Sequence, residues 1–198
     1  MLAHKPRERI LIALAELVAK RGYPGTTVEH IVKRAVVSRS TFYELFSNRE
    51  AALLALFDAA QKALAKGVAE AAKEADDWPS RVVAVLRTFL GYCSENPAVA
   101  RTCLVEFVTV GSAAIARYEQ SMEEIAPLFA GGRELAADPE ELPEALEDMV
   151  VGSVVWLVHQ RLLRGEAARI PDLLPTAVEI ATSPYLGEHK AAALAAGL

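Results

Sequence analysis

A short helix predicted over residues 39–46 carries side chains that can bind nucleic acid. Its apolar residues lie about one helical turn apart and are expected to point inward; they are Phe42, Leu45 and Phe46. Arg39, Ser40 and Tyr43 then share the outer side of the helix. A guanidinium and two hydroxyl groups can donate hydrogen bonds to phosphate oxygens and base edges, and a helix fits into the major groove of DNA. The pattern therefore favours a DNA-binding face.

This helix is expected to be the second of two short helices joined by a tight turn. The first is predicted over about residues 27–34, and its apolar residues share one face: Val28, Ile31, Val32 and Ala35. Thr26 or Thr27 can cap its start by accepting a hydrogen bond from a free backbone N–H, and Thr26 with Glu29 fits a capping box. Ser38 is the natural cap of the second helix.

An amphipathic helix predicted over residues 7–22 precedes this pair. Its apolar residues follow the spacing of one helix face, namely Ile10, Leu11, Leu14, Leu17 and Val18, and Gly22 is expected to stop it. Packed on the two short helices, it predicts a three-helix N-terminal domain.

The composition favours a soluble, globular chain, with 53% hydrophobic and 24% charged residues among 198. No apolar run reaches the roughly 18 residues of a membrane span, and the first residues lack the apolar core of a signal peptide. Cys93 and Cys103 lack a metal-ligand spacing and are expected to be buried in a reducing compartment. We therefore expect a cytoplasmic protein with no cofactor and no metal.

The charge is unevenly divided along the chain, whose net charge is −5. Residues 1–50 hold nine basic and five acidic side chains, whereas the remainder holds twelve basic and 21 acidic ones. A basic N-terminal part suits contact with phosphates, and an acidic remainder is kept away from them. Small domains also differ by a few charges without any such role.

The rest of the chain is expected to be helical, which predicts an all-α fold of about nine helices. A long helix over residues 50–75 would carry any shift from the body to the N-terminal domain. The further predicted helices span residues 79–95, 97–108, 112–130, 144–164 and 171–184. A polar loop over residues 131–143 is the best candidate for a mobile segment, and the Ala-rich tail from Gly187 is expected to be frayed.

The helix predicted over residues 144–164 is apolar on nearly all sides. Such a helix must be covered on more than one side, and a body of this size covers only one. A second subunit is therefore expected to cover the other side.

Several fixed spacings resemble the TetR family of bacterial transcriptional regulators over about residues 7–57. The matching residues are Arg21-Gly22-Tyr23, Thr26-Thr27-Val28, Ile31 to Ala35, Val37-Ser38, Thr41-Phe42-Tyr43, Phe46, Asn48 to Ala51 and Leu53. The resemblance implies an all-α homodimer with an N-terminal helix-turn-helix domain and a C-terminal domain that binds a small molecule. It implies domains over residues 1–49 for DNA binding, 50–75 for the connecting helix and 76–198 for the effector and the dimer.

By the same resemblance, the DNA-binding residues would be Thr27, Ser38, Arg39, Ser40, Thr41, Tyr43 and Arg49. Thr27, Tyr43 and Arg49 would contact phosphate, while Arg39, Ser40 and Thr41 would begin the helix that faces the groove. Three residues depart from the family pattern: Val36 stands for a glycine, Ser40 for glycine or alanine, and Leu45 for a frequent histidine. A β-branched Val36 is expected to make the turn less sharp.

The C-terminal residues that could line an effector pocket are Phe89, Tyr92, Cys93, Cys103, Phe107, Tyr118, Met122 and Trp156. Their types favour a small hydrophobic effector, although each taken alone is better explained as ordinary core. His159 has apolar helical neighbours and suits a buried or interface histidine better than a ligand contact. Glu106 suits a salt bridge or an exposed edge, with a ligand contact as the alternative.

An enzyme is not expected, because the four histidines are scattered and no HExxH, GxSxG, GxGxxG or Walker pattern occurs. The predicted function is a ligand-responsive regulator that represses transcription from a palindromic operator in double-stranded DNA. Its homodimer would form through residues 144–164 and 170–184. The alternative is a helical protein-interaction module that does not bind DNA.

Overall fold

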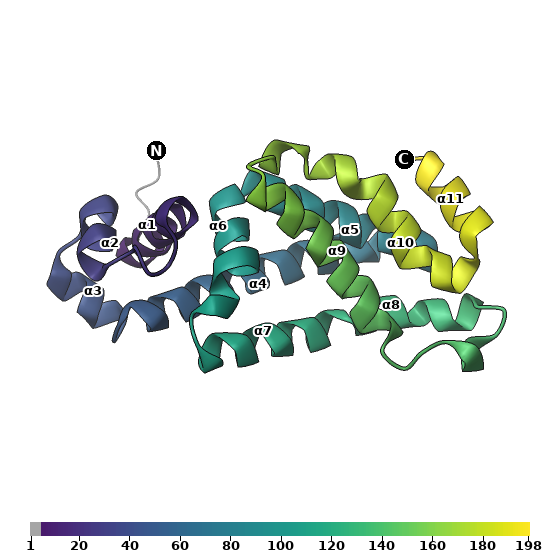
Figure 1. The fold of residues 1–198 in the computed structure, drawn as a ribbon, viewed down its shortest axis with the longest axis horizontal. Helices are drawn as coiled ribbons and strands as arrows, with labels where there is room; N and C mark the ends of the chain where they lie inside the picture. Colours follow the sequence, from purple (N-terminus) through teal and green to yellow (C-terminus); the bar gives the residue numbers. More distant parts are fainter. Residues whose placement is uncertain (1–4) are drawn as a thin grey trace. The chain divides into compact units, whose positions relative to one another are not determined.

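The computed structural model describes residues 5–198, and every regular element in that range is helical (Figure 1). Residues 1–4, including His4 and the start of the predicted 1–49 domain, lie outside the described residues. The α-helices are α1 (Pro6–Arg21), α2 (Val28–Ala35), α3 (Arg39–Leu45), α4 (Arg49–Lys73), α5 (Trp78–Glu95), α6 (Pro97–Arg101), α7 (Ser112–Ile125), α8 (Pro127–Ala130), α9 (Leu146–Leu163), α10 (Leu174–Leu186) and α11 (Glu188–Ala196). The predicted all-α class is confirmed.

The chain divides into two compact units, and each is described by itself. Unit 1 comprises residues 1–62 and 96–116, and unit 2 comprises residues 63–95 and 117–198. Among the described residues, no helix is both long and apolar enough to cross a membrane.

Unit 1 is built around the inner faces of α1, α2 and α3. The side chains that close this core are fully buried: Ile10, Leu14, Val18, Ile31 and Phe42. Gly22 ends α1 with a φ of 73°, and its N–H donates to the Val18 carbonyl at 2.8 Å. A left-handed backbone at this point favours glycine, which explains why the predicted stop is observed.

The second segment of unit 1 departs from the single helix predicted over residues 97–108. The α-helix α6 ends at Arg101 and is followed by a π-helical turn over Thr102–Glu106 and a 3₁₀ turn over Phe107–Thr109. The Thr102 hydroxyl donates to the Ala15 carbonyl of α1 at 3.2 Å. Phe107 is fully buried and stacks on Phe57 of α4, with ring centroids 4.1 Å apart.

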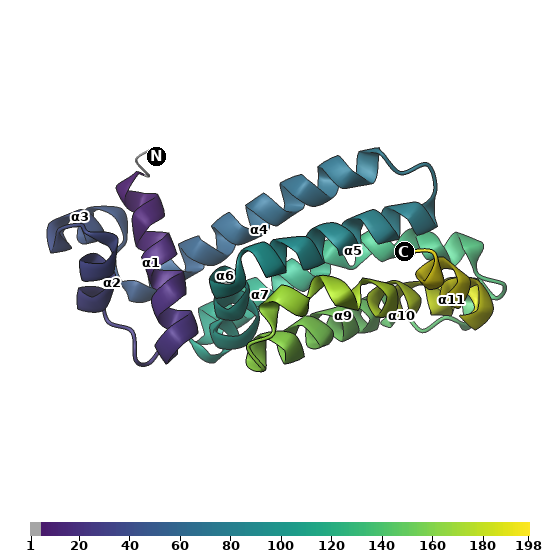
Figure 2. The same cartoon turned by 90° about the horizontal axis from the view of Figure 1, so that it is seen from above.

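Unit 2 is organised around α10, which packs against α5, α9 and α11 (Figure 2). The expected helix over residues 112–130 is broken at Pro127, where α8 begins after α7. The tail is not frayed, because α11 forms and buries Ala191 and Ala195. Small alanine side chains permit this packing.

Candidate nucleic-acid interface and effector groove

Ser38 caps α3, as the sequence predicts. Its Oγ accepts the Thr41 backbone N–H at 3.0 Å. The same Oγ lies 2.7 Å from the Ser40 Oγ and 2.8 Å from the Thr41 Oγ1. Three hydroxyl groups are therefore linked at the start of the helix, and Ser38 and Ser40 are exposed.

The outer side of α3 presents Arg39, Ser40 and Tyr43, all exposed. The Arg39 guanidinium lies over the Tyr43 ring, with its carbon 5.6 Å from the ring centroid. Phe42 and Phe46 are buried as expected, but Leu45 is 40% exposed and the expectation that it points inward is wrong. The α-helix ends at Leu45, and Phe42 and Phe46 already fill the inner side.

Thr27, rather than Thr26, caps α2. The Thr27 Oγ1 accepts the His30 N–H at 3.3 Å, and the His30 Nδ1 accepts the Thr27 N–H at 3.3 Å. His30 thus takes the part expected of Glu29 in the capping box. Thr26 is fully buried, and its hydroxyl donates to the Gly22 carbonyl at 2.9 Å. Thr27 remains exposed.

Val36 adopts the left-handed backbone that a glycine would adopt at the same place. Its φ and ψ are both 53°, and its side chain is 76% exposed. The expectation of a less sharp turn is therefore wrong, because the backbone keeps the conformation despite the β-branched side chain. A left-handed conformation costs roughly 1–2 kcal/mol for a residue with a Cβ.

Arg49 has protein partners that the sequence did not indicate. Its Nη1 donates to the carbonyl oxygens of Tyr23 and Thr26, and its guanidinium carbon lies 3.9 Å from the Tyr23 ring centroid. Glu106 completes this cluster by accepting the Tyr23 backbone N–H on its Oε2 at 3.4 Å. The predicted phosphate clamp thus holds the turn before α2, and Glu106 supports the same turn.

The residues predicted to line an effector pocket are divided between the two units. Cys103 and Phe107 are buried in unit 1, whereas Phe89, Tyr92, Cys93, Tyr118, Met122 and Trp156 belong to unit 2. Trp156 is 59% exposed and stacks on His159, with ring centroids 5.4 Å apart. Trp156 lies on an exposed face of α9.

Burial sets the chemistry of two of these residues. Desolvation raises the pKa of the Cys93 thiol to about 12, so the group is a neutral thiol at physiological pH. Desolvation also raises the pKa of the Tyr118 hydroxyl. Both residues therefore contribute uncharged groups.

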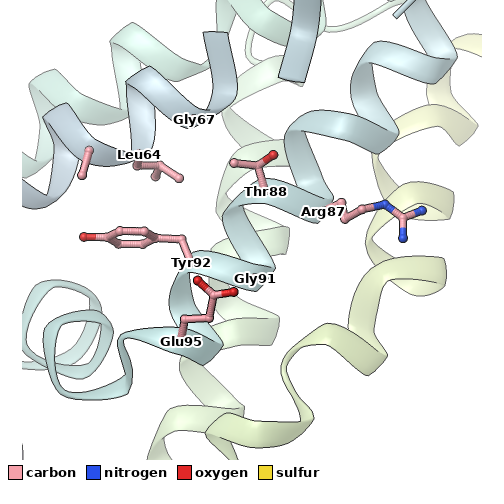
Figure 3. Close-up of a pocket in the computed structure, with 8 residues that line it drawn as sticks. Leu64, Gly67, Arg87, Thr88, Gly91, Tyr92 and Glu95 are labelled. Atoms are coloured by element: carbon pink, nitrogen blue, oxygen red, sulfur yellow. The ribbon is translucent and has the colours of Figure 1, made fainter. Parts of the chain in front are cut away.

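A groove of about 430 Å³ lies between the unit 2 part of α4 and α5 (Figure 3). Its lining residues are Ala63, Leu64, Gly67, Arg87, Thr88, Gly91, Tyr92 and Glu95. Of the predicted ligand residues, Tyr92 alone lines it. Apart from its chain neighbours and its own helix backbone, no atom lies within 4 Å of a Cβ built on Gly91, whereas a Cβ on Gly67 would lie 3.1 Å from the Thr88 Cγ2. Gly67 and Gly91, two glycines within helices, were the sequence feature that could have indicated this groove.

The outer face of α9 carries large apolar side chains at intervals of two helical turns. Met149, Trp156 and Leu163 are all exposed. Gly152 and Ser153 lie on the same exposed side. The opposite side is buried through Val150, Val154 and Val158, so the helix is apolar on both sides as predicted.

Arg133 fastens the loop before α9, a role that the sequence did not indicate. Its Nε and Nη2 donate to the two carboxylate oxygens of Glu147 at 2.8 and 2.9 Å. Its Nη2 also donates to the Pro143 carbonyl at 2.6 Å, and the Tyr185 hydroxyl donates to the Glu147 Oε1 at 2.9 Å. The Arg133 hydrogen bonds hold the pKa of Glu147 below its ordinary value. The loop predicted to be mobile is thus anchored.

Comparison with known proteins finds a family similarity for the N-terminal part of the chain. Residues 10–56 match the model of the bacterial regulatory proteins of the tetR family. An uncharacterized HTH-type transcriptional regulator from the lacX 3' region of Lactococcus lactis subsp. lactis is 35% identical over 52 residues. That match spans 26% of this chain and 26% of the relative. Over residues 10–56 the chain is therefore similar to the TetR family.

Solved structures extend the likeness of fold to most of the chain. The fatty acid degradation regulator FadR from Bacillus halodurans has a TM-score of 0.79 at 18% identity, covering 89% of this chain and 94% of that one. FadR from Bacillus subtilis, in complex with stearoyl-CoA, has a TM-score of 0.77 at 18% identity, covering 89% and 98%. A TetR family regulator from Marinobacter aquaeolei VT8 gives 0.66 at 20% identity, covering 87% and 94%.

Proposed function

We propose that the chain is a transcriptional repressor that binds a palindromic operator as a homodimer and is released by a small hydrophobic effector. The observation that carries the proposal is the outer side of α3. There Arg39, Ser40 and Tyr43 are exposed on a short, capped helix. These groups suit contact with base edges and phosphates in the major groove. The exposed Thr27 at the start of α2 adds a hydroxyl suited to a phosphate.

The exposed face of α9 supports the dimer. Met149, Trp156 and Leu163 would be covered by α9 and α10 of a second copy, over residues 144–164 and 170–184. A dimer would present two α3 helices about one turn of DNA apart, roughly 34–36 Å, as a palindromic site requires.

The effector is assigned to unit 2, within the body predicted over residues 76–198 and the adjoining part of α4. The groove beside Tyr92 has a volume in the range typical of small-molecule sites. A structure of similar fold holds stearoyl-CoA, so long-chain acyl compounds belong among the first effectors to try. Suppose that the DNA-binding state is favoured 99:1 over the released state. To reverse this ratio, an effector must bind the released state more tightly than the DNA-binding state by about 5.5 kcal/mol.

A genomic selection tests this function. The purified protein is incubated with sheared DNA of its source organism at two salt concentrations, and bound fragments are recovered and sequenced. The expected result is an enriched palindrome whose binding weakens steeply with salt, because cations condensed on the DNA are released on binding. Addition of the effector is then expected to release the recovered fragment.

The control is protein that has been unfolded and refolded to remove any bound effector. Enrichment only after refolding would identify a ligand-occupied starting state. Absence of enrichment in both preparations at low salt would reject DNA binding and favour a helical protein-interaction module. A monomeric mass in solution would reject the proposed dimer.

A further inference from the structure

The arginines of unit 1 are divided between those with protein partners and those with their N–H groups unused. Arg34 donates to the Glu16 carboxylate at 2.7 Å, and Arg49 donates to two backbone carbonyls. Within residues 5–198, the guanidinium groups of Arg7 and Arg39 take part in no hydrogen bond or ion pair. The last two are therefore available for an external ligand.

Arg7 and Arg39 are held in the same manner by aromatic rings of the α3 region. The Arg39 guanidinium lies over Tyr43 and the Arg7 guanidinium over Phe46, each with its carbon 5.6 Å from the ring centroid. Tyr43 lies within α3, and Phe46 is the residue that follows its last turn. Stacking on a ring restrains a guanidinium but leaves its N–H donors unoccupied.

The first turn of α1 fixes the position of the Arg7 backbone, from which the side chain extends. Pro6 begins the helix, and the Glu8 carboxylate accepts the Lys5 backbone N–H at 3.3 Å. Lys5 and Arg7 are both exposed. A second exposed cation beside Arg7 strengthens the attraction for an anion.

We propose that Arg7, stacked on Phe46, contacts a DNA phosphate beside the C-terminal end of α3, away from Arg39 at the start of that helix. The inference rests on the proposed function and adds α1 to a binding surface so far assigned to α2 and α3. A planar guanidinium with free donors matches a phosphate in geometry and charge. Because phosphates carry no base identity, Arg7 contributes affinity that is independent of sequence.

Three variants test the contact: Arg7→Ala, Arg7→Lys and Lys20→Ala. Lys20 is an exposed cation near the opposite end of α1 and serves as the matched control for charge. Each protein is titrated with the recovered operator and with a random duplex at several salt concentrations. Thermal melting of each variant is recorded without DNA.

Arg7→Ala is expected to weaken binding to both duplexes by the same factor, about tenfold, and to reduce the salt slope by about one. Arg7→Lys is expected to retain the slope, and Lys20→Ala to match the wild type. An unchanged slope for Arg7→Ala, or a loss confined to the operator, would overturn the phosphate contact. Reduced binding explained by a lower melting temperature alone would also overturn it. Wild-type protein that binds neither duplex would overturn the proposed function as well.

Discussion

The two compact units each use one arginine to fasten a loop to a helix, and the partners of the two arginines differ in charge. In unit 1, Arg49 donates to the neutral carbonyls of Tyr23 and Thr26 and stacks on a ring. In unit 2, Arg133 forms a two-pronged pair with the Glu147 carboxylate. Both arrangements fix a segment that would otherwise lack regular structure.

The different partners determine how each anchor responds to pH and which arginines can bind DNA. Carbonyl partners do not titrate, so the Arg49 anchor holds over the whole range in which the protein is folded. The Arg133 anchor depends on an ionised carboxylate and should weaken in acid. Arg49 is also a cation that unit 1 uses internally, whereas Arg39 and Arg7 remain available to an external anion.

The largest effect is expected from Arg49→Ala. The substitution removes two hydrogen bonds from a charged donor and the contact with the Tyr23 ring, at a cost of about 2–3 kcal/mol in the free energy of unfolding. Chemical denaturation measures the change, and hydrogen exchange of the α2 amides locates it. If Arg49 served only as a phosphate contact, stability would be unchanged and DNA binding alone would fall.

Arg39→Ala should give the opposite result to Arg49→Ala. Because Arg39 is exposed, folding stability should change little. Operator binding should weaken by about 1–3 kcal/mol if the guanidinium reads a base. Titration with operator and random duplexes separates the two roles, since an equal loss on both would make Arg39 a phosphate contact. A large loss of stability would contradict the comparison with Arg49.

The sequence predicted those parts of the site whose partners are close along the chain. The Ser38 cap, the inward Phe42 and the outward Arg39 follow from spacings within one short helix. The choice of His30 over Glu29 in the α2 cap was missed, because both residues lie within reach of the start of the helix.

Partners distant in the chain could not be predicted from spacing. The Glu106 contact with the Tyr23 N–H joins positions 83 residues apart, and Tyr185 lies 38 residues from Glu147. The effector residues stay a prediction for the same reason, since a concave site requires several helices to pack in known registers. The apolar types of Phe107 and Cys93 suit both a pocket and a core, and the structure places both in cores.

Acid should destabilise unit 2 before unit 1. The pKa of Glu147 is lowered in the folded state, so its stabilising contribution is present at neutral pH. It is lost as the pH falls below the ordinary value of about 4.5 and through the folded pKa. Hydrogen exchange of α9 and α10 amides at decreasing pH, compared with those of α1 to α3, measures the difference.

Glu147→Gln supplies the control for this acid effect, since it keeps the shape of the side chain and removes its titration. The variant should be less stable at neutral pH and should show a smaller acid-dependent step in α9 and α10, with the Arg161–Glu166 pair as the remaining contribution. If the wild type and Glu147→Gln respond to acid in the same way, the Arg133 pair does not distinguish the two units.

Val36→Gly should stabilise unit 1 by about 0.5–1 kcal/mol. Glycine adopts the left-handed backbone of Val36 without steric cost, although it also gains freedom in the unfolded chain, which offsets part of the benefit. Val36→Ala retains the Cβ and should give a smaller gain. Denaturant midpoints of the wild type, Val36→Gly and Val36→Ala rank their stabilities. A Val36→Gly protein less stable than the wild type would show that the exposed valine makes a stabilising contact.

The smallest effect compares the two glycines of the unit 2 groove. Gly91→Ala should raise stability by about 0.5–1 kcal/mol, because alanine favours helix and its Cβ would meet no atom within 4 Å. Gly67→Ala should give less or reverse the sign, since its Cβ would lie 3.1 Å from the Thr88 Cγ2. Melting curves with and without effector measure the stability of each variant and its stabilisation by the effector.

If an effector occupies the groove, Gly91→Leu should fill that space and weaken the effector's release of DNA while stability is retained. An unchanged effector response in Gly91→Leu would place the effector site outside this groove.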